Sequence, residues 1–241
     1  MIKYKNCRIC NSNNIETVIK FEKTPIGDAW KKVKKKFTTF YPLNIFFCKK
    51  CRSIQLKETI SEKKIYNNFF YEISVTSGLK EHYKKFSEQL TKKYFKENKK
   101  YKILDIGSND GSFLFPFSKK KFFCLGIEPT KHIARKANSR KIHTLNIFFN
   151  KKNSVKIKKK YGDFDLISLN FILANVDYIH NFLDGVDNLI KRDGILIIET
   201  SHILKVSQKF LFDTFFHEHI FYFSLRTLKK IFFDRGYKFL N

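Results

Sequence analysis

The sequence predicts an α/β protein in which a parallel sheet, covered by helices on both faces, follows a small cysteine-rich module. From about residue 100 onward, continuous apolar segments alternate with segments of helical spacing, which is typical of buried parallel strands and their crossover helices. Two Cys-x-x-Cys pairs within the first 51 residues set the N-terminal part of the chain apart. We therefore expect a metal-binding module at residues 1–60, a connecting segment with a helix at 61–98, and an α/β domain at 99–241.

Four of the five cysteines have the spacing of a zinc site. Cys7-x-x-Cys10 and Cys48-x-x-Cys51 supply four thiolates, which complete a tetrahedral shell. A closed shell of this kind is structural, because it leaves no position open for catalysis. Two disulfides are the alternative, and they would require an oxidising compartment. The fifth cysteine, Cys124, lies within an apolar segment and is expected in the core.

Residues 1–60 contain too few apolar side chains for an independent core, so zinc would supply folding free energy to this module. Residues 41–47 are expected to form a short strand that delivers the second cysteine pair. Residues 79–98 show helical spacing through Leu79, Tyr83, Phe86 and Leu90.

The α/β domain is predicted from alternating strand and helix patterns. Strands are expected at residues 102–106, 122–127, 163–170, 195–199 and 237–240. Helices are expected at 111–118, 132–141, 178–191 and 225–235, of which the last two end near Gly194 and Gly236.

The stretch from residue 102 to residue 128 has the layout of a nucleoside-cofactor site. Gly107 and Gly111 lack a Cβ, so the backbone can pass close to a ligand. Glu128 ends the next strand, 21 residues after Gly107, where a carboxylate can accept both hydroxyls of a ribose. The turn reads Gly-Ser-Asn-Asp-Gly-Ser and not G-x-G-x-x-G, the pattern that cradles a pyrophosphate. We therefore expect S-adenosylmethionine in preference to NAD, with an ordinary strand–turn–helix unit as the alternative.

The predicted cofactor residues share one rim of the sheet, at the ends of three strands. Asp110 and Glu128 are acids in an otherwise basic protein, and they suit the ribose or the methionine amine of the cofactor. Asn170 ends a third strand on the same rim. The full predicted set is Gly107, Ser108, Asn109, Asp110, Gly111, Glu128 and Asn170.

The net charge of +26 raises the question of nucleic-acid binding. Only seven of the 48 basic residues are arginines, whereas base and phosphate recognition favours arginine. The lysines are spread along the chain beside 28 phenylalanines, which is typical of a genomic composition bias. The charge pattern therefore argues against a nucleic-acid partner, and a nucleic-acid-binding zinc ribbon is kept only as a remaining alternative.

No segment of the sequence is typical of a membrane span or a signal peptide. Uncharged runs such as residues 166–176 are far shorter than the ~20 residues that a spanning helix needs. The first six residues lack the apolar core of a signal peptide. We therefore expect a cytoplasmic protein without a membrane partner, and the sequence leaves its oligomeric state open.

Taken in order, these motifs resemble those of the sugar C-methyltransferases of deoxysugar biosynthesis. The landmarks are Cys7-Arg-Ile-Cys10, Tyr41-Pro-Leu43, Cys48-Lys-Lys-Cys51, Tyr71, Glu81-His82, Gly107-Ser-Asn-Asp-Gly-Ser112, Gly126-Ile-Glu-Pro129 and Phe212-Asp-Thr-Phe-Phe-His-Glu-His-Ile-Phe-Tyr-Phe-Ser224. The resemblance implies a Rossmann-like class I methyltransferase domain behind a four-cysteine zinc-binding domain. It runs from residue 7 to about residue 236. In this family a further Rossmann-like domain follows, and the match stops before it.

The resemblance also implies an activity, which is methyl transfer from S-adenosylmethionine to carbon of a nucleotide-linked keto-sugar. Carbon next to a ketone becomes nucleophilic only after a base removes its proton and a donor stabilises the resulting oxyanion. By resemblance, His219 is the base, Glu218 orients the sugar, and Tyr71 is a donor near the substrate. Asn175 and Tyr222 are placed at the substrate in the same way.

Two positions depart from the family pattern and leave the acceptor open. Asn175 stands where the family usually has histidine, and Phe216 stands where it usually has tyrosine. An amide cannot titrate near neutrality as an imidazole does. We expect intact zinc and cofactor sites with altered substrate recognition. Methylation of oxygen or nitrogen on a related sugar is one alternative. A cofactor-binding remnant without turnover is another, because the reversed last strand of such sheets has no counterpart after residue 240.

Overall fold

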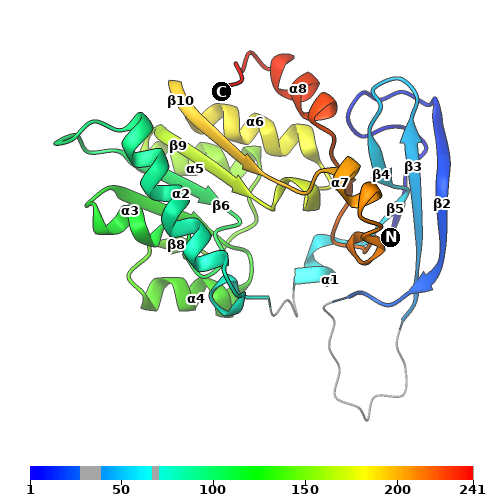
Figure 1. Ribbon diagram of the computed structural model, residues 1–241, viewed down its shortest axis with the longest axis horizontal. Coiled ribbons are helices and arrows are strands. Elements are labelled where there is room, and N and C mark those ends of the chain that lie inside the picture. The colour runs from blue at the N-terminus through cyan, green and yellow to red at the C-terminus, as the bar shows by residue number, and fades with distance from the viewer. Residues whose placement is uncertain (28–38, 67–70, 241) are drawn as a thin grey trace, which may run out of the picture. The chain divides into compact units, whose positions relative to one another are not determined.

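The computed structural model describes residues 1–27, 39–66 and 71–240 (Figure 1). The chain divides into two compact units. The first comprises Met1–Phe69, Leu173–Ile179 and Thr200–Asn241, and the second comprises Phe70–Ile172 and His180–Glu199. This division differs from the expected boundaries after residues 60 and 98, because two later segments of the chain group with the N-terminal module.

The second unit is built on a five-stranded parallel sheet in the order β10-β9-β6-β7-β8. The strands are β6 (Lys102–Ile106), β7 (Phe123–Ile127), β8 (Thr144–Leu145), β9 (Phe164–Asn170) and β10 (Ile190–Glu199). The strand order reverses beside β6, which lies between β7 and β9. Ligands of open α/β sheets bind beyond the carboxyl ends of the strands at such a point. The predicted parallel sheet is confirmed.

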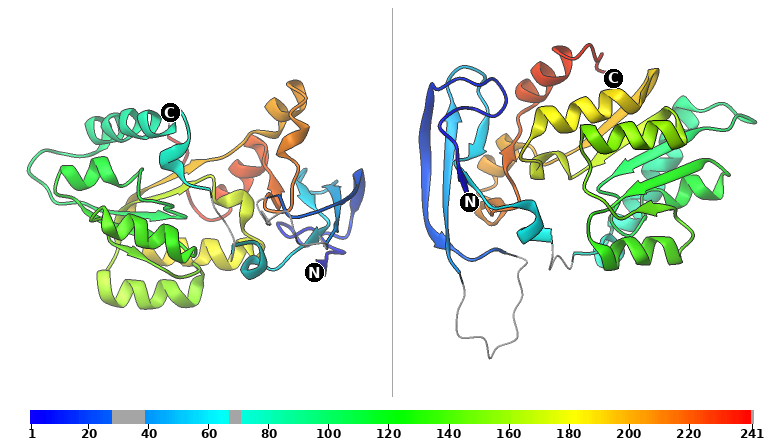
Figure 2. Two further views of the ribbon diagram at one scale, coloured as in Figure 1. Left: turned by 90° about the horizontal axis from the view of Figure 1, so that it is seen from below. Right: turned by 180° about the vertical axis from the view of Figure 1, so that it is seen from behind.

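Helices cover both faces of this sheet, as predicted: α2 and α5 lie on opposite sides of it (Figures 1 and 2). The helices are α2 (Leu79–Tyr94), α3 (Phe115–Lys119), α4 (Lys131–Ser139), α5 (Lys151–Tyr161) and α6 (Ile179–Leu189), with a 3₁₀ turn, η1, at Ile73–Val75. Tyr83 and Leu90 of α2 pack with Phe113 and Phe117 in one buried cluster. Within the described ranges, no helix is long and apolar enough to cross a membrane.

Some boundaries in this unit differ from the prediction for local reasons. Helix α3 begins at Phe115, because the chain from Gly111 first completes a turn in which the Phe115 amide donates to the Gly111 carbonyl at 2.9 Å. Helix α6 ends at Leu189, and the next residues join β10 through a register shift. Helix α5 was not predicted, because only Ser154 and Ile157 of its eleven residues are buried.

The first unit contains a four-stranded antiparallel sheet in the order β11-β4-β3-β2. Its strands are β2 (Ile15–Thr24), β3 (Tyr41–Cys48), β4 (Ile54–Leu56) and β11 (Phe221–Tyr222), and a separate ladder joins β1 (Ile2–Lys3) to β5 (Glu58–Thr59). The other elements are α1 (Glu62–Tyr66), η2 (Leu173–Asn175), α7 (Ile203–Gln208), η3 (Phe212–Thr214) and α8 (Leu225–Phe233). The predicted strand at 41–47 and helix at 225–235 are confirmed.

Strand β11 explains why residues 200–240 group with the cysteine module. Phe221 pairs with Gln55 and Tyr222 pairs with Ile54, so the strand after the His-Glu-His block belongs to the same sheet as β4. The predicted strand at 237–240 is wrong, because these residues have no regular structure. Tyr237 instead folds back on α8, where its amide donates to the Phe232 carbonyl at 3.0 Å.

We expect Gly126→Ala to destabilise the second unit, because β7 has no room for a side chain at this position. A Cβ there would lie 2.5 Å from Ser108 Oγ and 2.8 Å from Thr144 Oγ1, and both side chains are buried. Overpacking of this kind costs about 1–3 kcal/mol, so the melting temperature should fall. Val155→Ala on the exposed face of α5 is the control and should change little. An unchanged melting temperature for Gly126→Ala would contradict the packing described.

Candidate functional site

The turn after β6 requires glycine at the two predicted positions. Gly107 has φ of 77° and Gly111 has φ of 79°, a left-handed conformation that side chains disfavour. A Cβ on Gly107 would also lie 3.1 Å from the side chain of Ile172. The amides of Gly107 and Ser108 both donate to the carbonyl of Ile127, which fixes the turn to the end of β7.

The polar side chains of the turn hold the segment that carries Tyr71. Asn109 Oδ1 accepts from the Ile73 amide at 3.0 Å, and its Nδ2 donates to the Tyr71 carbonyl at 2.9 Å. Asp110 Oδ2 accepts from the Ser74 amide at 3.1 Å. The turn therefore places Tyr71, a predicted catalytic residue, beside the predicted cofactor residues. The sequence motif alone did not indicate that the turn holds this segment.

Asp110 is buried and fully engaged by the protein. Its carboxylate accepts from Ser112 Oγ at 2.6 Å and pairs with Arg140 Nη1 at 3.2 Å. Burial alone would raise the pKa of this carboxyl, but the hydrogen bonds from Ser112 and Ser74 and the charge of Arg140 bring it below its ordinary value. Asp110 is thus a charged anchor of the turn. Its predicted contact with the cofactor stays a prediction.

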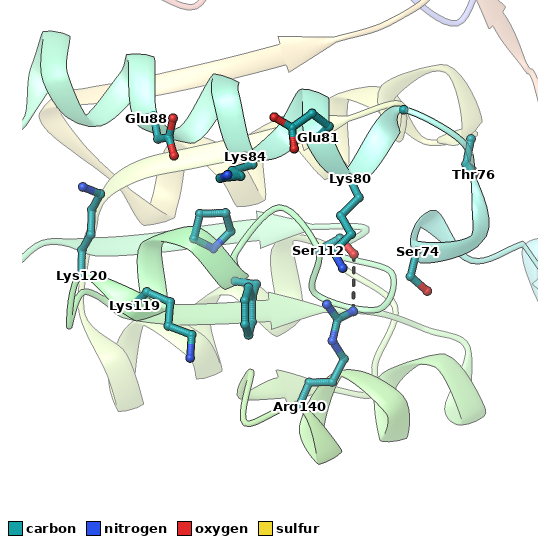
Figure 3. A pocket seen from close by; sticks show the side chains of 13 residues that line it. Ser74, Thr76, Lys80, Glu81, Lys84, Glu88, Ser112, Lys119, Lys120 and Arg140 are labelled. Carbon is teal, nitrogen blue, oxygen red and sulfur yellow. Dashed lines mark hydrogen bonds between the residues drawn. The ribbon is translucent and has the colours of Figure 1, made fainter.

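Arg140 also borders a groove of 740 Å³ beside α2 and α3 (Figure 3). Its guanidinium donates to the hydroxyl of Ser112, another residue that lines the groove. Lysines such as Lys80, Lys84 and Lys119 form much of the lining. None of the predicted cofactor residues lines it, so this groove is distinct from the rim at the strand ends.

Glu128 lies directly after β7 with its carboxylate against the turn. Its Oε2 accepts from the Asn109 amide at 3.1 Å, and its Oε1 accepts from the Thr130 amide at 2.7 Å. Burial raises the pKa of Glu128, while these amides oppose that shift. Each carboxylate oxygen can accept more than one hydrogen bond, so capacity remains for the two hydroxyls of a ribose.

Asn170 ends β9 on the same rim, and its side chain is 8% exposed. Within the described residues, neither its Oδ1 nor its Nδ2 has a hydrogen-bond partner, and the buried Ser108 Oγ also has none. An unpaired buried polar group costs about 1–3 kcal/mol, so these atoms favour a polar ligand at the strand ends. The residues present therefore fit a nucleoside cofactor.

Asp105 is a buried acid that the sequence reading missed. It lies within β6, two residues before Gly107, and Ser168 Oγ on β9 donates to it at 2.6 Å. Burial raises the pKa of Asp105 to about 7. The sequence signal for this residue is a single acid inside an otherwise apolar segment. That segment predicts a strand but does not by itself indicate a role for the acid.

The four predicted metal ligands lie together in the first unit. All four sulfur atoms fall within 4.8 Å of one another, with Cys7 and Cys51 at 3.5 Å and Cys10 and Cys48 at 3.6 Å. A tetrahedron with Zn–S bonds of 2.3 Å separates its sulfurs by about 3.8 Å. The four cysteines are free thiols, so their arrangement fits zinc and not the disulfide alternative.

Both cysteine pairs lie in the same kind of turn. The Asn11 amide donates to the Cys7 carbonyl and the Arg52 amide donates to the Cys48 carbonyl, each at 2.8 Å. Asn11 and Arg52 both have positive φ, which reverses the chain after each pair. Gln55 Nε2 donates to Cys7 Sγ at 3.0 Å, a contact of the kind that orients metal ligands.

His219 has the geometry of a neutral base. Its Nδ1 lies 3.0 Å from the Thr214 carbonyl, which can only accept, so Nδ1 carries the proton and Nε2 keeps its lone pair. Burial lowers the pKa of His219, and the Thr214 carbonyl opposes this shift in part. The Phe216 ring lies 3.9 Å from the imidazole, centroid to centroid. The imidazole is therefore unprotonated at neutral pH.

The first unit brings the other predicted residues of the His-Glu-His block close to His219. Glu218 is buried, and its charge adds to burial in raising the pKa of Tyr222. Within the described chain, the buried Tyr222 hydroxyl has no hydrogen-bond partner. His217 is buried and packs edge-on against Tyr41.

Asn175 joins this group through the backbone. The Ile220 amide donates to the Ala174 carbonyl at 2.7 Å, and Asn175 Nδ2 donates to the Tyr66 hydroxyl at 3.1 Å. Tyr71 belongs to the second unit, where its hydroxyl accepts from Thr76 Oγ1 at 3.0 Å.

Comparison with protein families identifies the class of protein that these features define. Residues 79–241 match the family described as "Methyltransferase domain", and residues 7–66 match the family described as "Putative zinc binding domain". The chain therefore belongs to the methyltransferase-domain family, with a zinc-binding domain in front. The predicted combination of the two domains is confirmed.

The chain is similar to the C-methyltransferase NovU of Streptomyces niveus, with 25% identity over 243 residues. The match covers 98% of this chain and 56% of NovU, so the chain spans about half the length of that relative.

Two solved structures show the same fold as the methyltransferase region. A SAM-dependent methyltransferase from Archaeoglobus fulgidus has a TM-score of 0.52 and 17% identity, over 66% of this chain and 69% of that one. The plantazolicin methyltransferase BpumL, solved with SAH, has a TM-score of 0.50 and 13% identity, over 65% and 63%. The predicted Rossmann-like class I methyltransferase fold is confirmed.

We expect the purified chain to bind about one zinc ion, measured by elemental analysis. Cys48→Ser should lose the metal, because three thiolates leave the shell incomplete. Chelation should raise hydrogen exchange first in residues 1–60, since zinc supplies folding free energy there. Cys124→Ser, a change in a buried cysteine of the second unit, is the control and should keep the metal. Zinc content unaffected by Cys48→Ser would contradict the assignment.

Proposed function

We propose that this chain is an S-adenosylmethionine-dependent methyltransferase that alkylates carbon of a nucleotide-linked keto-deoxysugar through a base-generated enolate. The observation that carries the proposal is His219, a half-buried imidazole whose Nδ1–H is held by the Thr214 carbonyl and whose Nε2 is left as a base. The similarity to a C-methyltransferase along nearly the whole chain supports transfer to carbon.

The cofactor would lie at the carboxyl ends of β6, β7 and β9. The backbone from Gly107 to Gly111 would approach its methionine part, Glu128 would accept the ribose hydroxyls, and Asn170 would supply an amide. When bound, the cofactor supplies a methyl group on a positively charged sulfur. Asn109 and Asp110 would act mainly by fixing the turn and the segment with Tyr71, as their hydrogen bonds indicate.

His219 would take the proton from the carbon next to the ketone at its Nε2. The electron pair of that C–H bond would move onto the ketone oxygen as an enolate and return to form the new carbon–methyl bond. The sulfur–methyl bond would break in the same step, and its electron pair would stay on the sulfur. Tyr71 and Tyr222 are the proposed donors to the developing oxyanion, and Glu218 is the proposed partner for the sugar. These roles on the substrate side of the reaction are part of the proposal.

Transfer to oxygen or nitrogen of a related sugar is the second candidate, and Asn175 favours it. Its amide is hydrogen-bonded to Tyr66 and cannot exchange a proton near neutrality, so the site has one titratable group fewer than the resemblance implies. A weaker base is sufficient for acceptors that already carry a lone pair.

Isotope exchange separates these candidates. The zinc-loaded chain is incubated in D₂O with a nucleotide-linked 4-keto-deoxysugar and S-adenosylmethionine, and the product is analysed by mass spectrometry. We expect a new carbon–methyl bond at the carbon beside the ketone in the product, and deuterium at that carbon in the recovered substrate. A methylated product without washout at that carbon would favour oxygen or nitrogen transfer. Absence of any turnover would favour a remnant that only binds the cofactor.

Glu128→Ala should weaken S-adenosylmethionine binding by about 1–3 kcal/mol, because the ribose would lose a charged hydrogen-bond partner. Isothermal titration calorimetry measures this change. Glu88→Ala on α2 removes an exposed acid of the same unit and should leave the dissociation constant unchanged. Equal affinities for Glu128→Ala and the unmodified chain would contradict the proposed ribose contact.

His219→Ala should abolish turnover and leave cofactor affinity nearly unchanged. In the unmodified chain, burial lowers the pKa of His219 below the ordinary 6.5, and the base is active above its own pKa. The acid limb of the rate should therefore have its midpoint below pH 6.5, which a pH profile of kcat/KM measures. His143→Gln is the control in the second unit. A profile that keeps its acid limb in His219→Ala would assign the base elsewhere.

A further inference from the structure

A buried arginine connects the metal site to the catalytic block within the first unit. Arg8 stands between Cys7 and Cys10, and its side chain is only 5% exposed. Its guanidinium pairs with Asp177 at 3.3 Å, donates to the carbonyl of Leu56 and stacks on the ring of Tyr4. The same turn that carries two metal ligands therefore places a cation against two distant stretches of chain.

Gln55 joins Arg8 to the sulfur cluster. Its Oε1 accepts from the Arg8 amide at 3.2 Å and from Arg8 Nε at 3.3 Å. Its Nε2 donates to Cys7 Sγ at 3.0 Å. One buried side chain of β4 thus contacts both a metal ligand and the arginine, so the positions of the two are coupled.

Asp177 fixes the other end of this connection. Its side chain is 7% exposed, and it accepts from the Tyr4 hydroxyl at 2.9 Å and from Thr59 Oγ1 at 2.8 Å in addition to Arg8. These bonds hold the chain immediately after Ala174 and Asn175. The Asp177 carboxylate is therefore bound to the N-terminal module through three of its side chains, those of Tyr4, Arg8 and Thr59.

The two stretches that Arg8 contacts, at Leu56 and at Asp177, are both connected to Ile220, the residue after His219. The Leu56 amide donates to the Ile220 carbonyl at 2.9 Å, and the Ile220 amide donates to the Ala174 carbonyl at 2.7 Å. Ile220 is thus fixed on one side by β4 and on the other by the segment that ends at Asp177. The backbone position of His219 depends on both.

We propose that Arg8 and Asp177 are positioning residues for His219, and that metal loading of the four-cysteine site acts on His219 through them. Calling His219 the base rests on the proposed function, whereas the coupling is a property of the first unit. A bound metal fixes the Cys7–Cys10 turn and with it Arg8. Because a buried guanidinium cannot be left without its partners, movement of that turn shifts Leu56 and Asp177, and Ile220 follows.

Lys49 provides a matched control. It occupies the same position in the second pair, Cys48-Lys49-Lys50-Cys51, but its side chain is 52% exposed and pairs with Glu16 at the surface. Replacing Arg8 or Lys49 removes one positive charge from within a cysteine pair. Of these two side chains, Arg8 is the one with buried contacts.

The test compares zinc-loaded Arg8→Met, Arg8→Lys, Asp177→Asn and Lys49→Met in the full chain, together with the chelated unmodified chain. Hydrogen exchange is followed by mass spectrometry in peptides covering residues 173–179 and 216–223. We expect Arg8→Met, Asp177→Asn and chelation each to speed exchange there at least tenfold. Arg8→Lys should restore part of the protection, and Lys49→Met should match the unmodified chain.

The turnover rate gives a second readout, which would not change if the Arg8–Asp177 pair only stabilised the fold. In Arg8→Met, kcat should fall at least tenfold while the dissociation constant for S-adenosylmethionine is unchanged. Wild-type exchange in zinc-loaded Arg8→Met would overturn the proposal, and if that variant does not fold, wild-type exchange in Asp177→Asn would do so. Exchange coupling in a chain without methyl transfer would refute the proposed function and leave the coupling standing. Methyl transfer without the coupling would refute only this inference.

Discussion

The turn between β6 and α3 depends on one constraint, which is that buried polar groups must be paired. Asp110 and Asn109 are buried, and amides and a carbonyl of residues 71–74 are among the partners that satisfy them, beside Ser112 and Arg140 at Asp110. The same residues that make the turn polar therefore attach the segment in front of α2 to the end of the sheet. This explains why the turn, which is the proposed cofactor site, carries Asn-Asp between its glycines. A smaller, glycine-rich turn could approach a ligand equally well but could not hold that segment.

The first unit also depends on paired buried polar groups, which here hold distant stretches of the chain together. Its sheet is small, and its core is supplemented by the four-cysteine cluster and by the buried Arg8–Asp177 pair. A buried ion pair is weak evidence for stability, because desolvation offsets much of the attraction between its charges. It does require one particular arrangement of the two side chains. That specificity suits a unit in which residues near positions 8, 56, 177 and 220 must meet. The His-Glu-His block inherits its position from these contacts and not from a helix or strand of its own.

Much of this architecture could be predicted from the sequence, because its signals are local. Continuous apolar runs identified β6, β7 and β9, and cysteine spacing identified the metal ligands. Strand β2 was missed although its residues alternate between half-buried and exposed. The fold-back of Tyr237 and the pairing of β11 with β4 depend on contacts between distant residues, which one sequence does not reveal. For the same reason, Asn109 and Asp110 could be placed at the cofactor turn, but their hold on residues 71–74 could not be predicted.

The pairing of β11 with β4 also affects how the protein is made. Residues 54–56 leave the ribosome long before residues 221–222, so the edge of β4 stays unpaired while more than half of the chain is synthesised. Open strand edges invite pairing with other chains, and late-forming contacts of this kind slow folding. An N-terminal fragment that contains every metal ligand would keep this edge exposed permanently. Such a fragment would be prone to aggregate even with its metal bound.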